Sequence, residues 1–144
     1  MTGSSAIDAE RAFTRAARGR RRAALARRLR RVPADAGRLC VYDERRVSHG
    51  IAGGRHGIRE IPISAIHGTL EPSRAAMFDC RFRPSGRARR RWERVWLAEQ
   101  HGTVMPPISV VEVDDGYAIR DGHHRVSVAM ARGAVSIDAT VDAA

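Results

Sequence analysis

Residues 117–132 read Tyr-Ala-Ile-Arg-Asp-Gly-His-His-Arg-Val-Ser-Val-Ala-Met-Ala-Arg, which places a strand end, a sharp turn and a helix start in one short span. Gly122 lets the chain turn sharply, and apolar residues recur at helical spacing after it. A helix start presents unpaired backbone N–H groups and the positive end of the helix dipole, and Arg125 adds a two-pronged positive donor. We therefore expect this turn to bind a phosphate group.

The residues around the turn predict strands on both sides of it. Residues 108–113, Ile-Ser-Val-Val-Glu-Val, are rich in β-branched residues, and Asp-Asp-Gly at 114–116 is typical of a hairpin turn before the strand at 117–120. Gly133 stands where a left-handed residue closes a helix, and residues 136–141 alternate as a last strand. The predicted order is hairpin, turn, helix and strand.

Two further blocks precede this region. Residues 59–66 read Arg-Glu-Ile-Pro-Ile-Ser-Ala-Ile, and residues 106–110 read Pro-Pro-Ile-Ser-Val. Together with the Gly-x-x-Arg turn from Gly122 to Arg125, and over residues 59–141, they resemble the ParB/sulfiredoxin superfamily. The resemblance implies an α+β fold: a ParB/sulfiredoxin-like domain with a small mixed sheet and packed helices.

A group of small bacterial ParB-like proteins is similar in three blocks. These are Phe-Asp-Cys-Arg-Phe-Arg-Pro at 78–84, Arg-Trp-Glu-Arg at 91–94 and Asp-Gly-His-His-Arg-Val-Ser-Val-Ala at 121–129. The resemblance implies a phosphate-bearing ligand, such as the nucleotides CTP, ADP or ATP with magnesium, and a role in chromosome or plasmid maintenance or regulation. The implied ligand-binding residues lie in the turn and in a loop that faces it: Asp121, Gly122, His123, His124, Arg125 and Arg74.

Two departures narrow what the resemblance implies. Partition ParB proteins resemble Gly-Glu-Arg-Arg-x-Arg-Ala at this turn and use it on the triphosphate of CTP, whereas His124 and Ser127 stand here where two of the arginines would be. Sulfiredoxins are similar to Gly-Cys-His-Arg at the same place and use the cysteine as nucleophile, whereas His123 occupies that position here. Sulfiredoxin chemistry is therefore excluded.

A third relative leaves an enzymatic alternative open. The free-serine kinase has a turn similar to Asp-Gly-His-His-Arg, transfers phosphate from ADP to a small hydroxyl substrate and needs a carboxylate near the end of its first strand. Glu71 is the acid just beyond Ile66 and is the candidate catalytic residue, in a loop predicted for residues 67–74. The alternatives are thus a nucleotide-dependent phosphotransferase or nucleotide hydrolase, a nuclease, or a non-catalytic interaction protein.

The basic charge lies mainly in two segments. All 26 basic residues are Arg, and the net charge is +10. Residues 1–31 hold ten Arg against Asp8 and Glu10, for +8, residues 32–80 balance, residues 81–94 contribute +6 and residues 95–144 contribute −4. Both basic segments are predicted to be helical. Such segments bind phosphate backbones without sequence preference, and a solvated helix face is the alternative.

The first basic segment predicts a helix over residues 5–32 with a break or bend near Gly19. Residues 33–37 end it, and we place the domain boundary there. The chain is thus divided into a basic helical N-terminal extension, residues 1–37, and a ParB/sulfiredoxin-like domain, residues 38–144. The thin apolar stripe of the helix packs on the domain, pairs with a second copy in a homodimer, or orders only with an acidic partner.

The second basic segment predicts an amphipathic helix over residues 87–100. Trp92 and Trp96 share one face of it and are expected in the core. Its arginines project elsewhere and are the candidate contacts for DNA without base specificity: Arg87, Arg89, Arg90, Arg91 and Arg94.

Several single residues have simpler expected roles. Asp121 is expected to cap the turn by accepting backbone N–H bonds, with magnesium binding as the alternative, and His123 to be a phosphate contact or else an exposed or capping residue. Adjacent histidines at a helix start do not chelate one metal ion, so no metal site is predicted. Cys40 and Cys80 are expected as free thiols.

The remaining features are weak signals. Residues 41–47 predict a short helix, followed by a glycine-rich loop in which His49 and His56 are surface residues. There is no apolar run long enough to span a membrane and no secretory signal pattern, so a cytoplasmic protein is expected.

Overall fold

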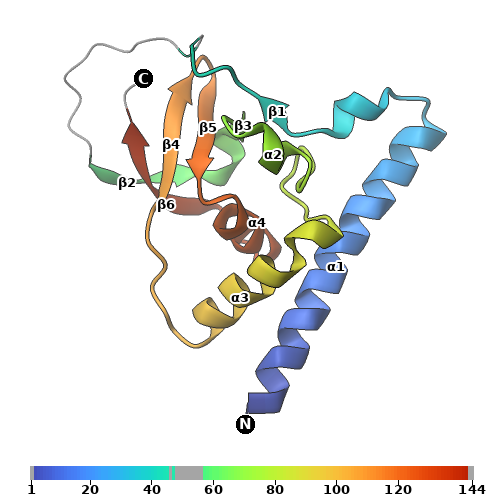
Figure 1. Cartoon of the computed structure of the whole chain (residues 1–144), viewed down its shortest axis with the longest axis vertical. Helices are drawn as coiled ribbons and strands as arrows, with labels where there is room; N and C mark the ends of the chain where they lie inside the picture. Colours follow the sequence, from blue (N-terminus) through green and yellow to red (C-terminus); the bar gives the residue numbers. More distant parts are fainter. Residues whose placement is uncertain (1, 46, 48–56, 143–144) are drawn as a thin grey trace.

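The computed structural model describes residues 2–45, 47 and 57–142. A mixed sheet lies at one end of the molecule, and three helices follow one another outward from it (Figure 1). Helix α4 (His123–Ala131) packs against the sheet, α3 (Arg89–Gln100) packs on α4, and α1 (Thr2–Leu29) packs on α3. The predicted α+β fold, with packed helices and a preceding N-terminal helix, is confirmed.

Over the described residues, the sheet has six strands in the order β1-β3-β5-β4-β6-β2. Their bounds are β1 (Cys40–Val41), β2 (Ile58–Pro62), β3 (Ile66–Thr69), β4 (Ile108–Val113), β5 (Gly116–Asp121) and β6 (Ser136–Asp142). β3 is parallel to β1 and β5, and β4 is parallel to β6. β4 pairs antiparallel with β5, and β6 with β2. The predicted hairpin, turn, helix and last strand are therefore confirmed.

Trp92 and Phe13 join the helices to the core. Trp92 is fully buried, and its Nε1 donates a hydrogen bond of 2.8 Å to Ser127 Oγ on α4. The ring of Phe13, on α1, meets the Trp92 ring edge-on with centroids 5.6 Å apart. Trp96 is half-buried, and the guanidinium carbon of Arg132 lies 4.4 Å from the centroid of its ring. The core prediction thus holds fully for Trp92 and in part for Trp96.

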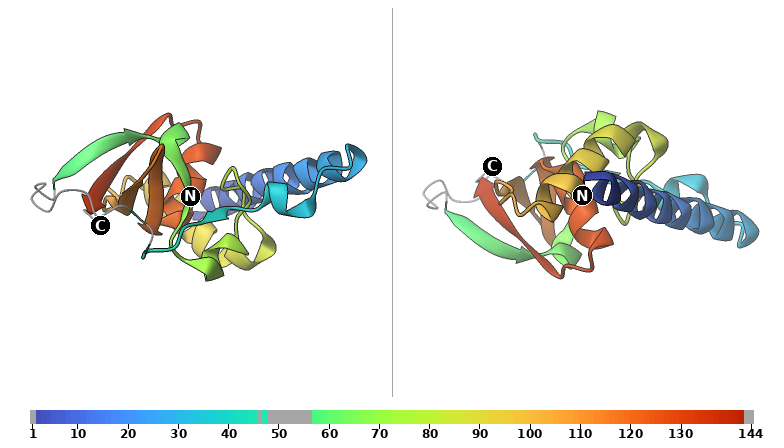
Figure 2. Two further views of the ribbon diagram at one scale, coloured as in Figure 1. Left: turned by 90° about the horizontal axis from the view of Figure 1, so that it is seen from above. Right: turned by 90° about the horizontal axis from the view of Figure 1, so that it is seen from below.

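Helix α1 is continuous through Gly19, so the predicted break is wrong. Arg83 explains why a glycine is accommodated there. The Arg83 side chain packs closely against Gly19, and its Nη1 donates to the Gly19 carbonyl at 3.3 Å. Asp79 Oδ2 in turn accepts a bond of 2.8 Å from Arg83 Nε. This contact fastens the middle of α1 to the domain, and the C-terminal part of the helix extends past it (Figures 1 and 2).

Three other local predictions are corrected by pairing with distant strands. The helix predicted over residues 41–47 is wrong for the described residues 41–45 and 47. Cys40 and Val41 instead pair with β3, after the 3₁₀ turn η1 (Ala34–Gly37). The block at residues 59–66, which the resemblance implies is one first strand, is divided by the 3₁₀ turn η2 (Ile63–Ala65), which separates β2 from β3. The loop predicted over 67–74 holds most of β3 and the start of α2 (Pro72–Ala75).

Two expectations concern surface features. Cys40 and Cys80 are free cysteines, as predicted, and both are exposed. The histidines at 49 and 56 lie outside the described residues. Within the described ranges, every helix is too short or too polar to cross a lipid bilayer.

Candidate functional site

Gly122 forms the junction between β5 and α4. Its φ of 111° and ψ of 22° lie in the left-handed region, which favours glycine. A Cβ at this position would stand 2.5 Å from Ile108 Cγ2, so the available space requires glycine as well. The strand therefore enters the helix without an intervening loop, and the next two side chains, His123 and His124, are buried.

His123 is held by Thr69 and Phe78. It is 4% exposed, and its Nε2 lies 2.6 Å from Thr69 Oγ1. The same hydroxyl accepts a bond of 2.8 Å from the backbone N–H of Glu71. The His123 ring stacks on Phe78 with centroids 6.3 Å apart. The expectation of an exposed or capping His123 is wrong, because the turn directs this ring into the interior.

His124 is buried, and its Nε2 lacks a polar partner among the described residues. It is 6% exposed, and its ring meets the Phe78 ring at 83° with centroids 5.1 Å apart. Its Nε2 is inaccessible to solvent and has no hydrogen-bond partner among the described residues. Leaving such a group unsatisfied costs about 1–3 kcal/mol.

A cavity of about 360 Å³, here called the α4 cavity, lies at the start of α4. Residues 121–125 line it together with Arg74 of α2, Arg91 and Arg94 of α3, and an apolar wall of Val95, Ala98, Met105 and Pro106. In the part of the chain that the structure describes, none of these three arginines forms an ion pair. The α4 cavity is therefore positively charged.

Arg125 fixes the loop that precedes β4. Its Nη1 donates to the carbonyl oxygens of Pro106 and Pro107, at 2.5 and 2.9 Å, and its Nη2 donates to Asp121 Oδ2 at 3.1 Å. No side chain among the described residues caps α4, so the predicted capping role of Asp121 is wrong. Three of the five N–H donors of Arg125 are taken by these bonds, and its charge is paired with Asp121. Its main role is therefore to hold the wall of the cavity in place.

Burial and positive charge keep both histidines neutral. Burial, and then the charges of Arg74 and His124, lower the pKa of His123 from 6.5 to about 4. Burial, and then the charges of Arg91 and Arg74, lower the pKa of His124 from 6.5 to about 4. Asp121 opposes both shifts but is the weaker influence. Arg74 therefore acts on both rings, which places it beside the turn as the resemblance implied.

The arginines predicted for DNA divide among different surfaces. Arg91 and Arg94 line the α4 cavity, whereas Arg89 lies 5.2 Å over the ring of Phe13 and faces α1. Arg87 and Arg90 are exposed outside both places. Helix α3 therefore contributes arginines both to the α4 cavity and to the surface facing α1, because residues one or two apart on a helix point in different directions.

Glu71, the candidate catalytic acid, lies next to the site but outside the lining of the α4 cavity. Its backbone N–H is fixed on Thr69, and its side chain is exposed. The sequence analysis did not identify Thr69 and Phe78, which contact the buried histidines. Phe78 belongs to the block quoted at residues 78–84, but it was given no role there. Nothing in the sequence around Thr69 indicated a site residue. Over residues 2–45, 47 and 57–142, no three His, Cys, Asp or Glu side chains gather around a point that would hold a metal ion.

Replacing Gly122 with alanine should destabilise the protein much more than the same change at Gly133. Gly133 also has a positive φ, of 78°, but a Cβ there would meet nothing within 4 Å. We expect Gly133→Ala to lower the free energy of unfolding by about 1–2 kcal/mol through backbone strain alone. Gly122→Ala should add roughly 1–3 kcal/mol from the contact with Ile108. Denaturant unfolding of both variants checks this, and equal losses would contradict it.

The buried histidines should make stability depend on pH. Their folded pKa lies below the unfolded value of 6.5, so the unfolded chain binds more protons between pH 6.5 and about 4. The full stability is present above pH 6.5 and is lost as the pH falls toward 4, by an amount on the order of 3 kcal/mol per histidine. Unfolding of His124→Gln at several pH values should show a flatter dependence of stability on pH than unfolding of the wild type. An unchanged slope in His124→Gln would contradict the assignment.

Comparisons with known proteins give a likeness in structure. No protein-family model matches the chain. No curated protein matches it either. Among solved structures, a sulfiredoxin from Arabidopsis thaliana matches with a TM-score of 0.43 and 22% identity, over 61% of this chain and 86% of that chain.

Proposed function

We propose that the α4 cavity binds the phosphate of a nucleotide or of another small phosphate-bearing molecule. One observation carries the proposal: His124 lines a positively charged cavity, and its buried Nε2 has no partner among the described residues. A neutral imidazole that holds its proton on Nε2 donates to a phosphate oxygen. A bound phosphate would therefore give this nitrogen a partner, which it lacks among the described residues.

The helix start supplies further donors. α4 is nine residues long, and no side chain among the described residues caps its first turn. Its first backbone N–H groups and the helix dipole favour an anion at this end. The left-handed Gly122 brings these groups directly to the end of β5, where the α4 cavity lies.

The arginines supply the charge that a phosphate needs. Arg74 and Arg91 line the same cavity as His124, and after burial their charges are the next causes that lower the pKa of this histidine. A phosphate oxygen pairs well with a planar guanidinium. The cavity volume of about 360 Å³ falls in the range of small-molecule sites.

The resemblance to nucleotide-using relatives favours a nucleotide as the ligand. We propose binding rather than turnover, because Glu71 lies outside the lining of the α4 cavity. In this proposal Arg74, Arg91 and His124 contact the phosphate, while Arg125 and Thr69 position the residues that do.

Thermal unfolding with added ligand tests the proposal. The probes are inorganic phosphate and CTP, ATP, ADP and GTP with magnesium. A ligand that binds only the folded state at 100 times its Kd should add about 2.7 kcal/mol to the free energy of unfolding and raise the Tm. At least one probe should do so in the wild type, and the double variant Arg74→Gln/Arg91→Gln should lose the shift.

The matched control is Arg87→Gln/Arg90→Gln, which removes the same charge from exposed positions outside the α4 cavity. It should keep the ligand-induced shift. The proposal is wrong if no probe raises the Tm, or if both double variants lose the shift equally.

A further inference from the structure

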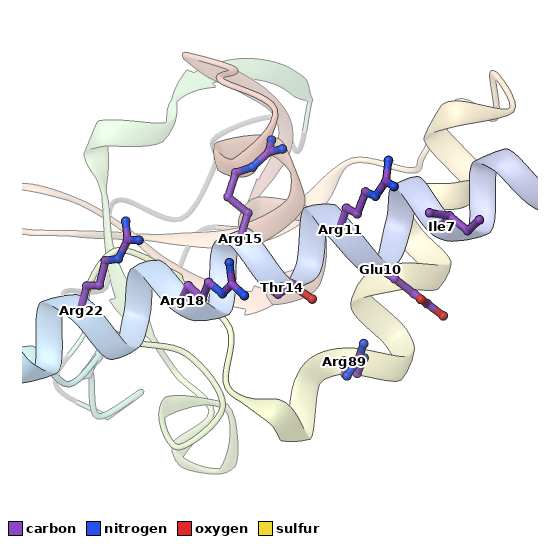
Figure 3. A pocket seen from close by; sticks show the side chains of 8 residues that line it. All are labelled: Ile7, Glu10, Arg11, Thr14, Arg15, Arg18, Arg22 and Arg89. Atoms are coloured by element: carbon purple, nitrogen blue, oxygen red, sulfur yellow. The ribbon is translucent and has the colours of Figure 1, made fainter.

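Helix α1 carries a row of arginines that the α4 cavity does not use. Arg11, Arg15, Arg18 and Arg22 follow one another at spacings of four, three and four residues. At 3.6 residues per turn and a rise of 1.5 Å per residue, this spacing confines them to an arc of about 60° and a length of about 16 Å. Figure 3 shows the four side chains along one stretch of α1, with Arg89 on the neighbouring α3.

The row lies on the side of α1 that faces away from the core. The buried residues of this helix, Ala9 and Phe13, belong to the opposite side. Within residues 2–45, 47 and 57–142, none of the four arginines forms an ion pair. Two copies of the chain meeting through this row would repel each other, so the row does not suit a dimer interface.

Two adjoining cavities run beside the row. One, of about 520 Å³, is lined by the row itself together with Ile7, Glu10, Thr14 and Arg89. The other, of about 440 Å³, lies between α1 and the turn at residues 84–86. Because Thr14 and Arg89 line both cavities, the two form one furrow, here called the α1 groove. It shares no lining residue with the α4 cavity.

The second cavity contains polar atoms that lack partners. Arg20 and Ser85 both line it, and each has one polar atom, Arg20 Nε and Ser85 Oγ, that is inaccessible to solvent and has no hydrogen-bond partner in the part of the chain that the structure describes. Arg89 is held between the cavities, because its Nε donates to Glu93 Oε1 at 3.0 Å and its guanidinium lies over Phe13. A guanidinium donor, a hydroxyl and a fixed arginine form a site suited to a phosphate oxygen.

We propose that the α1 groove binds the phosphate backbone of nucleic acid without reading its bases. A single phosphate would not span a row about 16 Å long. A duplex carries one charge per about 1.7 Å of its axis, so the same length presents about nine phosphates. Phe13 is buried, and the lining of the groove has no exposed aromatic ring on which a base would stack.

An acidic protein segment fits the groove less well. Protein interfaces depend on a few aromatic or large apolar anchors in their centre. The lining of the α1 groove offers Ile7 as an exposed apolar side chain, at one end of the row. A chain of evenly spaced charges matches the row better than a surface of mixed side chains.

Binding of a labelled DNA duplex, measured by fluorescence anisotropy over a series of salt concentrations, tests the proposal. Each phosphate contact contributes about 0.9 to the slope of log K against log salt. Replacing all four arginines of the row with Gln should therefore reduce the slope by up to about 3.6. Duplexes of different base composition should bind alike, and Arg74→Gln/Arg91→Gln should bind DNA as the wild type does.

The matched control removes four exposed arginines elsewhere: Arg28, Arg30, Arg45 and Arg81. Its slope should change by less than about one. If the quadruple row variant does not fold, the double variant Arg11→Gln/Arg15→Gln should reduce the slope of log K against log salt by about half as much, up to about 1.8.

Three outcomes would overturn the proposal. One is a slope of log K against log salt that is unchanged in the row variant. Another is a slope that falls equally in the row variant and in its control. The third is displacement of the DNA by polyglutamate at equal charge, which would indicate an acidic protein as the partner. None of these outcomes bears on the α4 cavity, because the row variant should keep the thermal shift with nucleotide.

Discussion

The left-handed conformation of Gly122 is the constraint on which the site depends. It lets β5 pass directly into α4, with Ile108 packed against the Cα where any side chain would clash. Two histidines follow at once, and both enter the interior against Phe78. A looser connection would leave them at the surface, where water would satisfy their nitrogens and the arginines would have little effect on their pKa values.

Helix α3 links the two positively charged regions and keeps them apart. Trp92 fixes the helix in the core through its bond to Ser127 on α4 and its contact with Phe13 on α1. From that position the helix presents Arg91 and Arg94 to the α4 cavity and Arg89 to the α1 groove. Each region also contains buried polar atoms without partners among the described residues, which distinguishes both from a merely solvated charged face.

Sequence patterns predicted the elements that local spacing determines. The hairpin, the turn, α4 and the last strand all follow from periodicity and glycine placement within one continuous stretch. Patterns failed where distant segments decide the outcome. β1 forms only because β3 lies beside it, and Gly19 is tolerated in α1 because Arg83 packs on it.

For the candidate site too, the sequence pointed to residues of one local segment but not to the contacts between distant segments. The residues of the turn were identified, but the burial of His123 and the bonds from Arg125 to the loop before β4 depend on tertiary contacts that a pattern does not contain. The division of the α3 arginines could have been predicted, since helical geometry alone separates Arg89 from Arg91.

The central claim is that a phosphate sits on the first turn of α4 beside His124. Titration of ¹⁵N-labelled protein with inorganic phosphate, followed by amide NMR spectra, tests it most directly. The account predicts that the backbone amides of His123, His124 and Arg125 shift most, in step with one another and with saturation. Shifts confined to the arginines of α1, or no saturable shift at these three amides, would contradict it.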